Sequence, residues 1–157
     1  MAEAAAGPGA EALADALAAV ARAMGVENAS VAVLPNEEGG LLGRVDGEGV
    51  DALVGRDGET IDALQYLCGQ IASRAEGTRI RVMVDAGDYR ARRAESLERL
   101  ARRAADEVLE HGDEIELEAM TPHDRRLIHM VLKEYDGVVT RSEGEEPNRR
   151  IVVEPAE

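Results

Sequence analysis

The fold of this chain is decided by residues 53–67, which read LVGRDGETIDALQYL. Val50, Leu53 and Val54 are apolar at spacings of three and four residues, the period of a helix, and Gly55–Gly58 then interrupts that pattern. A second helical pattern follows directly. Glycines permit a tight turn because they lack a Cβ. This stretch therefore predicts two helices joined by a Gly-x-x-Gly turn.

The chemistry of this turn suits an anion. The first N–H groups of the second helix have no intrahelical partners and, together with the helix dipole, attract negative charge. Arg56 adds a fixed positive charge beside them. A plain connection between two helices explains the tetrapeptide equally well. The turn is not a Walker loop, since no Gly-Lys-Ser/Thr follows it.

Hydrophobic periodicity predicts the remaining elements on both sides of the turn. We expect helices over 10–24, 48–54, 59–74 and 91–110 and a helix that begins at Thr121, with strands over 29–35, 41–45, 78–84, 114–120, 138–141 and 149–153. The first two strands are expected to form a hairpin. Thr121, Pro122 and Asp124 are typical of the N-cap, first and third positions of a helix.

The order up to residue 84 is helix, strand, strand, helix, Gly-x-x-Gly, helix, strand, which is the arrangement of a type II KH domain. Residues 53–67 resemble the KH signature of the Jag family, the SpoIIIJ-associated proteins also called KhpB. The resemblance extends from about residue 10 to the C-terminus. It implies that the turn clamps the sugar–phosphate backbone of about four nucleotides.

In that resemblance, Gly55 and Gly58 shape the clamp, and Arg56 and Asp57 flank the nucleic-acid backbone. Asp57 departs from many relatives, which have a basic or neutral residue there. It is expected to pair with Arg56 or to cap the following helix, and in either case to weaken backbone binding. The apolar residues around the turn are candidates for a groove that takes bases or for the core beneath it: Val50, Leu53, Val54 and Ile61.

A second motif lies in residues 120–129, which read MTPHDRRLIH. Arg125 and His129 are four residues apart and share one helix face, where an exposed pair could bind phosphate or stack on a base. A solvated Arg and a partly packed His are the alternative. The run resembles the hallmark of the R-three-H domain, which binds single-stranded nucleic acid and follows the KH domain in Jag proteins. The resemblance implies a site of Arg125, Arg126 and His129, with Arg149 and Arg150 as weaker candidates.

These patterns predict an α+β protein, with a type II KH domain joined by a long helix to a small α/β R-three-H domain. We expect a disordered N-terminus at 1–9, the KH domain at 10–86, a connecting helix at 87–112 and the R-three-H domain at 113–157. Many family members carry an additional N-terminal domain. Because the chain starts almost at the first KH helix, the role of that domain is expected to be absent here.

The charge balance excludes a protein that coats polyanions. The 157 residues include 18 basic and 32 acidic side chains, for a net charge of −14. The stretch from Arg74 to Arg103 is locally positive, with nine Arg against five acids. It is interpreted either as a solvated helix face with favourable i, i+4 ion pairs or as a basic path between the two candidate sites. Small, selective and salt-sensitive sites are expected.

Other residue counts limit the remaining function classes. The single cysteine, Cys68, has apolar neighbours and is expected to be a buried thiol. No spacing of His or Cys predicts a metal site, no residue set predicts catalysis, and no cofactor is expected. No membrane insertion and no secretory signal are expected, so the predicted location is cytoplasmic.

The partners implied by the resemblance are single-stranded RNA, with single-stranded DNA as a further option, and a small single-KH protein. A homodimer is also a candidate assembly. The implied role is post-transcriptional regulation, with cell-wall synthesis and cell division as the processes affected. The alternative function is a protein-interaction module or dimerising adaptor with little affinity for nucleic acid.

Overall fold

The computed structural model describes residues 3–157 and confirms an α+β protein. The chain divides into two compact units, Met1–Arg90 and Ala91–Glu157. Each unit has its own hydrophobic core. No helix within the described residues has both the length and the apolar character needed to span a bilayer.

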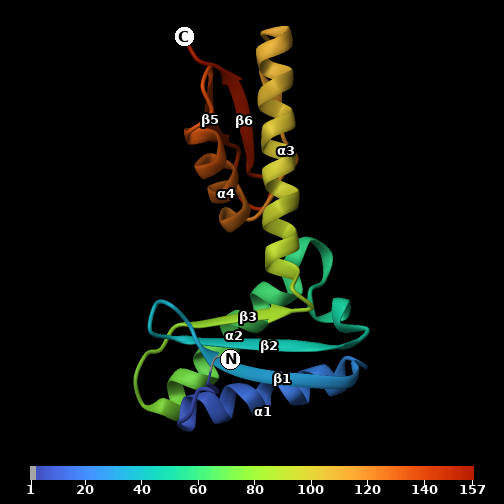
Figure 1. The fold of residues 1–157 in the computed structure, drawn as a ribbon, viewed down its shortest axis with the longest axis vertical. Coiled ribbons are helices and arrows are strands. Elements are labelled where there is room, and N and C mark those ends of the chain that lie inside the picture. The colour runs from blue at the N-terminus through green and yellow to red at the C-terminus, as the bar shows by residue number, and fades with distance from the viewer. Residues whose placement is uncertain (1–2) are drawn as a thin grey trace. The chain divides into compact units, whose positions relative to one another are not determined.

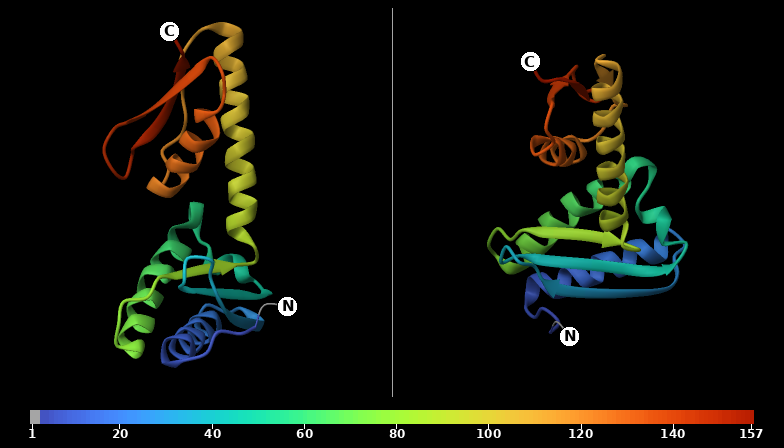
Figure 2. Two further views of the ribbon diagram at one scale, coloured as in Figure 1. Left: turned by 60° about the vertical axis from the view of Figure 1, so that its left-hand side comes forward. Right: turned by 45° about the horizontal axis from the view of Figure 1, so that its top comes forward.

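The first unit has the predicted order of elements. It contains α1 (Pro8–Ala23), β1 (Glu27–Pro35), β2 (Leu41–Glu48), two 3₁₀ turns (Val50–Leu53 and Arg56–Gly58), α2 (Glu59–Glu76) and β3 (Val82–Ala86). The sheet order is β1-β2-β3 (Figure 1), with β1 and β2 antiparallel as the predicted hairpin and β2 parallel to β3. Helices α1 and α2 lie side by side against this sheet (Figure 2) and share one apolar core with it.

Several boundaries in the first unit differ from the predicted ones. Strand β2 runs to Glu48 and not to residue 45, and the helix predicted over 48–54 is a 3₁₀ turn at Val50–Leu53. Helix α1 begins at Pro8, inside the segment for which disorder is predicted, while residues 1 and 2 of that segment lie outside the described residues. Strand β3 begins at Val82 and not at residue 78. The reason is that the Ser73 hydroxyl binds both the N–H and the carbonyl of Ile80, at 3.1 and 3.3 Å. Ile80 therefore hydrogen-bonds to α2 and not to a neighbouring strand.

The second unit is built on α3 (Tyr89–His111), of which residues from Ala91 onward belong to it. It adds β4 (Ile115–Glu116), α4 (Pro122–Lys133), β5 (Val138–Glu143) and β6 (Arg150–Pro155). The sheet order is β4-β6-β5, antiparallel throughout. The apolar stripe of α3 lies in the same core as residues of α4 and β6. The helix expected from sequence to be a connector thus supplies one face of this core.

Strand β4 is much shorter than the strand predicted over 114–120. Only Ile115 and Glu116 pair regularly with β6. Further along, Leu117 donates to the carbonyl of Ile151 at 2.9 Å, and Met120 donates to the carbonyl of Arg149 at 3.2 Å. These two isolated bonds keep the segment beside β6 without a regular ladder.

Helix α4 begins as predicted. Thr121 is its N-cap, and its hydroxyl accepts a hydrogen bond from the N–H of Asp124 at 3.3 Å. Pro122 occupies the first turn, where no backbone N–H is needed. The local chemistry of this boundary was therefore sufficient to locate it.

Candidate nucleic-acid interface

The Gly-x-x-Gly loop adopts a conformation that requires glycine at both ends. Gly55 and Gly58 have φ values of 72° and 83°. A Cβ on Gly55 would lie 2.1 Å from Oγ1 of Thr60, and one on Gly58 would lie 2.7 Å from Oη of Tyr89. Between them, Asp57 has a φ of 52°, in the left-handed region that Asp tolerates better than most residues. The loop is thus held tightly against α2 and Tyr89.

The helix N-terminus at this loop offers fewer free donors than expected from the sequence. The N–H groups of Thr60 and Ile61 both bind the carbonyl of Val54, each at 3.1 Å. The N–H of Glu59 binds the carbonyl of Arg56. Backbone carbonyls therefore already accept hydrogen bonds from these N–H groups at the start of α2. The N–H groups are not free to bind an anion, which corrects the expectation from sequence. The positive charge of the loop comes from the Arg56 side chain.

Arg56 and Asp57 both project from the loop as exposed side chains. Neither forms a hydrogen bond or ion pair through its side chain with residues 3–157. The two uses expected for Asp57, pairing with Arg56 and capping α2, are both absent; the N-cap position of α2 is Gly58, without a side-chain cap. Arg56 and Asp57 are therefore available to a ligand, one attracting a phosphate and the other repelling it.

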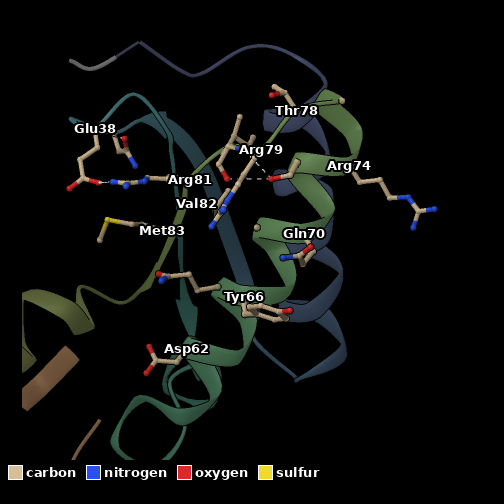
Figure 3. Close-up of a pocket in the computed structure, with 16 residues that line it drawn as sticks. Glu38, Asp62, Tyr66, Gln70, Arg74, Thr78, Arg79, Arg81, Val82 and Met83 are labelled. Atoms are coloured by element: carbon tan, nitrogen blue, oxygen red, sulfur yellow. Dashed lines mark hydrogen bonds and ion pairs between the residues drawn. The ribbon is translucent and has the colours of Figure 1, made fainter. Parts of the chain in front are cut away.

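A groove of about 1070 Å³ runs along α2 and the segment between α2 and β3 (Figure 3). Tyr66 lies on its helical side with 68% of its surface exposed. Three arginines line it. Arg81 is engaged by Glu38 at 2.6 Å, whereas Arg74 and Arg79 have no side-chain partner within the described chain. The groove therefore combines an aromatic face, an exposed Met83 and two uncompensated positive charges.

These groove residues differ from those expected from sequence. Leu53, Val54 and Ile61 are buried in the core, and Val50 packs against it. Of the two roles left open for these four residues, the structure gives them the core role. The sequence does contain a signal for the groove residues: Tyr66, Gln70 and Arg74 recur every fourth residue, on a face of α2 that the apolar stripe does not occupy.

Arg125 is buried, with 7% of its surface exposed, which corrects the expectation of an exposed Arg–His pair. Its Nη1 donates to the carbonyl of Met120 at 2.6 Å and to that of Arg149 at 3.5 Å. Its Nη2 donates to the carboxylate of Glu146, and this contact lowers the pKa of Glu146 below its ordinary value. The guanidinium thus connects α4 to the loop between β5 and β6.

His129 is half-buried and also faces the interior of the unit. Its Nδ1 is hydrogen-bonded with the hydroxyl of Thr140 on β5. Arg126, in contrast, is exposed and has no side-chain partner within residues 3–157. Of the three candidate residues in this motif, Arg125 and His129 therefore make contacts inside the unit, and Arg126 is an exposed cation.

Most of the other arginines expected to be basic-surface residues are engaged. Nε and Nη2 of Arg93 bind the buried carboxylate of Asp124 at 3.0 and 2.8 Å, which connects α3 to α4. The expected i, i+4 pairs Glu95–Arg99 and Glu98–Arg102 are present at 3.9 and 2.9 Å. These contacts support the solvated-face interpretation for this part of α3.

The two weaker candidates, Arg149 just before β6 and Arg150 at its start, also have neighbours. Arg149 donates from Nε to the Ser142 hydroxyl at 2.7 Å, and Nε of Arg150 lies 2.9 Å from Glu116.

Cys68 is buried as expected, and burial raises its pKa. Within residues 3–157, no group of three His, Cys, Asp or Glu side chains is placed to hold a metal ion.

Comparison with known proteins gives a match to the R-three-H domain over residues 95–155. The match begins inside α3, in agreement with the place of this helix in the second core. A protein named RNA-binding protein KhpB from Clostridium symbiosum is 41% identical over 107 residues, 68% of this chain and 48% of that protein.

Two further proteins of the same name are similar. The Lactiplantibacillus plantarum protein is 41% identical over 101 residues, 64% of this chain and 31% of that protein. The Bacillus subtilis protein is 38% identical over 111 residues, 69% of this chain and 53% of that protein. The chain spans about half, or less, of the length of these relatives.

Proposed function

This chain is a homologue of the Jag/KhpB family and carries an R-three-H domain at residues 95–155, and on that premise we propose that it binds single-stranded RNA without catalysing a reaction. The KH-like arrangement of the first unit provides one binding site. The second unit provides another. The proposal makes no use of a metal or a cofactor.

The observations that carry the proposal are the loop and the groove along α2, the helix that begins at the loop. Arg56 is an exposed cation on a loop whose backbone is held by Thr60 and Tyr89, and it suits a phosphate. The groove along α2 has Tyr66 on its wall, an exposed ring of the kind on which unpaired bases stack. Arg74 and Arg79 supply the charge that a nucleic-acid backbone needs. Gly55, Arg56, Asp57 and Gly58 are the proposed clamp.

The second unit contributes through Arg126, the exposed member of the Arg125, Arg126 and His129 motif. Since the two units are one chain, RNA held by one unit remains near the other, and two weak contacts act as a stronger one. The acidic remainder of the chain repels nucleic acid that makes no specific contact. Binding is therefore modest, selective and sensitive to salt.

The cellular role proposed is post-transcriptional regulation in the cytoplasm, affecting cell-wall synthesis and cell division. A small single-KH protein and a second copy of this chain are the proposed protein partners. Crosslinking the protein to nucleic acid in living cells, followed by sequencing of the bound fragments, tests this role. Recovery of transcripts unrelated to those processes would contradict it.

The direct test of RNA binding is a titration of a fluorescein-labelled single-stranded RNA at several salt concentrations. About four phosphate contacts predict a slope of log K against log[salt] near −3, because each contact on a single strand contributes about −0.7. A matched DNA oligomer and a duplex RNA serve as controls. Absence of binding, or binding that does not change with salt, would refute the proposal.

A second candidate function is a protein-interaction module, and one observation favours it. Leu67 and Ile71 are exposed on α2, 56% and 44%, and neither lines the groove. Because they are four residues apart, they form one apolar stripe that a protein could cover. Sedimentation of the wild type and of Leu67→Ser/Ile71→Ser tests this candidate. An assembly that dissociates in the variant supports it, and a monomer in both contradicts self-association.

A further inference from the structure

We infer that the second unit contacts RNA phosphates through the exposed face of α4 formed by Arg126, Met130 and Lys133, and not through the Arg125–His129 pair. We call these three residues the outer α4 face. The inference deepens the proposed RNA binding and rests on it. Met130 and Lys133 were not among the site residues expected from sequence.

The spacing of the three residues places them together. Met130 follows Arg126 by four residues and precedes Lys133 by three, so the three side chains form one stripe along α4. All three are exposed, Met130 at 61%. Arg126 and Lys133 are separated by seven residues, about 10 Å along the helix axis. They therefore reach different phosphates, while the thioether of Met130 lies between them as an apolar surface for a base.

On α4, arginine or lysine charge without a neutralising partner is found only on the outer α4 face. Its one acid, Asp124, is buried and neutralised by Arg93. Its other arginine, Arg125, is neutralised by Glu146. Within the part of the chain that the structure describes, Arg126 and Lys133 have no ion pair, so both charges of the outer α4 face are uncompensated.

The Arg125–His129 pair cannot take this role in the observed structure. The Arg125 side chain is 9% exposed, and its donors are directed at two backbone carbonyls and the Glu146 carboxylate. A phosphate would have to displace Glu146 and enter the interior of the unit. Nδ1 of His129 is held by Thr140. Since these contacts fix α4 against β5 and β6, they leave residues 126, 130 and 133 directed to solvent.

The test is fluorescence anisotropy with the full chain and a fluorescein-labelled single-stranded oligouridylate. Arg126→Glu/Lys133→Glu is compared with Arg22→Glu/Arg103→Glu, which changes the net charge equally at exposed positions on α1 and α3. We expect about a tenfold loss of affinity in the first variant and less than about a twofold loss in the control. The salt slope should fall by about 1.4, the contribution of two single-strand phosphate contacts.

Each outcome decides between the hypotheses. If the wild type binds and both double variants bind alike, whether unchanged or equally weakened, the outer α4 face is refuted while the proposed function stands. If the wild type does not bind RNA, both are refuted. Arg126→Gln/Lys133→Gln, which adds no negative charge, should lose affinity in the same direction. Thermal unfolding of each variant establishes that it is folded at the assay temperature.

Met130 has a separate test in the same assay. Met130→Leu keeps an apolar side chain of similar volume and should bind like the wild type. Met130→Asp places a negative charge between the two proposed phosphate contacts and should bind more weakly. Equal affinity of the two variants would exclude Met130 from the contact surface.

Discussion

The ring of Tyr89 lies directly over the Cα of Gly58. A Cβ added to Gly58 would come within 2.7 Å of Oη and 3.1 Å of Cε1 of Tyr89. Because the φ of Gly58 is also positive, at 83°, two independent constraints exclude a side chain there. The glycine at the end of the loop is therefore required by the fold of the first unit as well as by the proposed clamp.

Gly58→Asp should abolish RNA binding at the loop and should also destabilise the first unit. Gly25→Asp is the matched control, since Gly25 has a φ of 79° and no atom within 4 Å of an added Cβ. Both variants share the cost of a left-handed side chain, about 1–2 kcal/mol, and only Gly58→Asp adds the clash with Tyr89. Urea unfolding measures the difference. Equal stability of the two variants would show that the Tyr89 contact relaxes at no cost.

Asp57→Asn should strengthen RNA binding two- to fivefold. Asn tolerates the left-handed backbone at this position, and the change removes a negative charge beside the proposed phosphate, an effect of about 0.5–1 kcal/mol. Asp15→Asn removes an equal charge from the exposed surface of α1 and should leave affinity unchanged. Anisotropy titrations compare the two. A similar gain in both would assign the effect to net charge and not to the loop.

Tyr66→Ala should weaken RNA binding by about 1–3 kcal/mol, the contribution of one base stacked on an aromatic ring. Tyr66→Phe keeps the ring and should bind like the wild type. Because Tyr66 is 68% exposed, its removal should change the free energy of unfolding by no more than about 0.5 kcal/mol. Leu67→Ala, the exposed neighbour outside the groove, is the control. Unchanged binding by Tyr66→Ala would exclude the groove as the site for bases.

Arg125→Ala should destabilise the second unit by at least about 2 kcal/mol, because it removes a buried side chain, the donor to the carbonyl of Met120 and the ion pair with Glu146. Arg126→Ala, the adjacent exposed residue, should stay within about 0.5 kcal/mol of the wild type. Chemical denaturation measures both. If the two variants were equally stable, the internal contacts of Arg125 would contribute nothing to folding.

The pair of Arg125 and Glu146 should also make stability depend on pH in the acid range. The pKa of Glu146 is lowered in the folded protein from its ordinary value of 4.5. Its contribution is therefore complete above that value and is lost as the pH falls through the folded pKa. Denaturation from neutral pH into the acid range should show this loss. Glu146→Gln should be less stable at neutral pH and should show a smaller loss on acidification.

Glu143 is the control for that experiment, because a hydrogen bond from Arg141 lowers its pKa in the same direction. Glu143→Gln should reduce the loss of stability at acid pH by its own contribution. The loss of stability due to Glu146 should remain. If Glu146→Gln had the pH dependence of the wild type, the ion pair with Arg125 would not be formed in solution.

Features that depend on neighbouring residues were predictable from sequence. The helix period of residues 59–74 corresponds to α2, and the alternation around residues 29–45 corresponds to the β1–β2 hairpin. Thr121 caps α4 through a bond to Asp124, three residues away. The α+β class followed from these elements, and the family resemblance followed from two motifs in one order. Apart from the order of the two motifs and the class that follows from the elements together, each of these features is encoded by residues close together in the sequence.

Features that depend on distant residues were not predictable in this way. Strand 114–120 was expected from alternation alone, but the partner strand β6 pairs regularly with only two of its residues. The N–H groups at the start of α2 were expected to be free, but the carbonyl of Val54 accepts from two of them. The groove beside α2 was not foreseen, because residues 77–81 approach the helix only after the chain has folded back.

By itself, then, the sequence determined the order of elements, the α+β class, the glycine loop and the R-three-H motif, because spacing and composition act locally. Only the tertiary structure decided which charges remain free. Arg125 and Arg126 are adjacent and chemically identical, yet Arg125 meets Met120, Glu146 and Arg149 while Arg126 meets solvent. Successive residues of a helix point about 100° apart, so the packing of α4 against β5 and β6 decides which of the two arginines a ligand can reach.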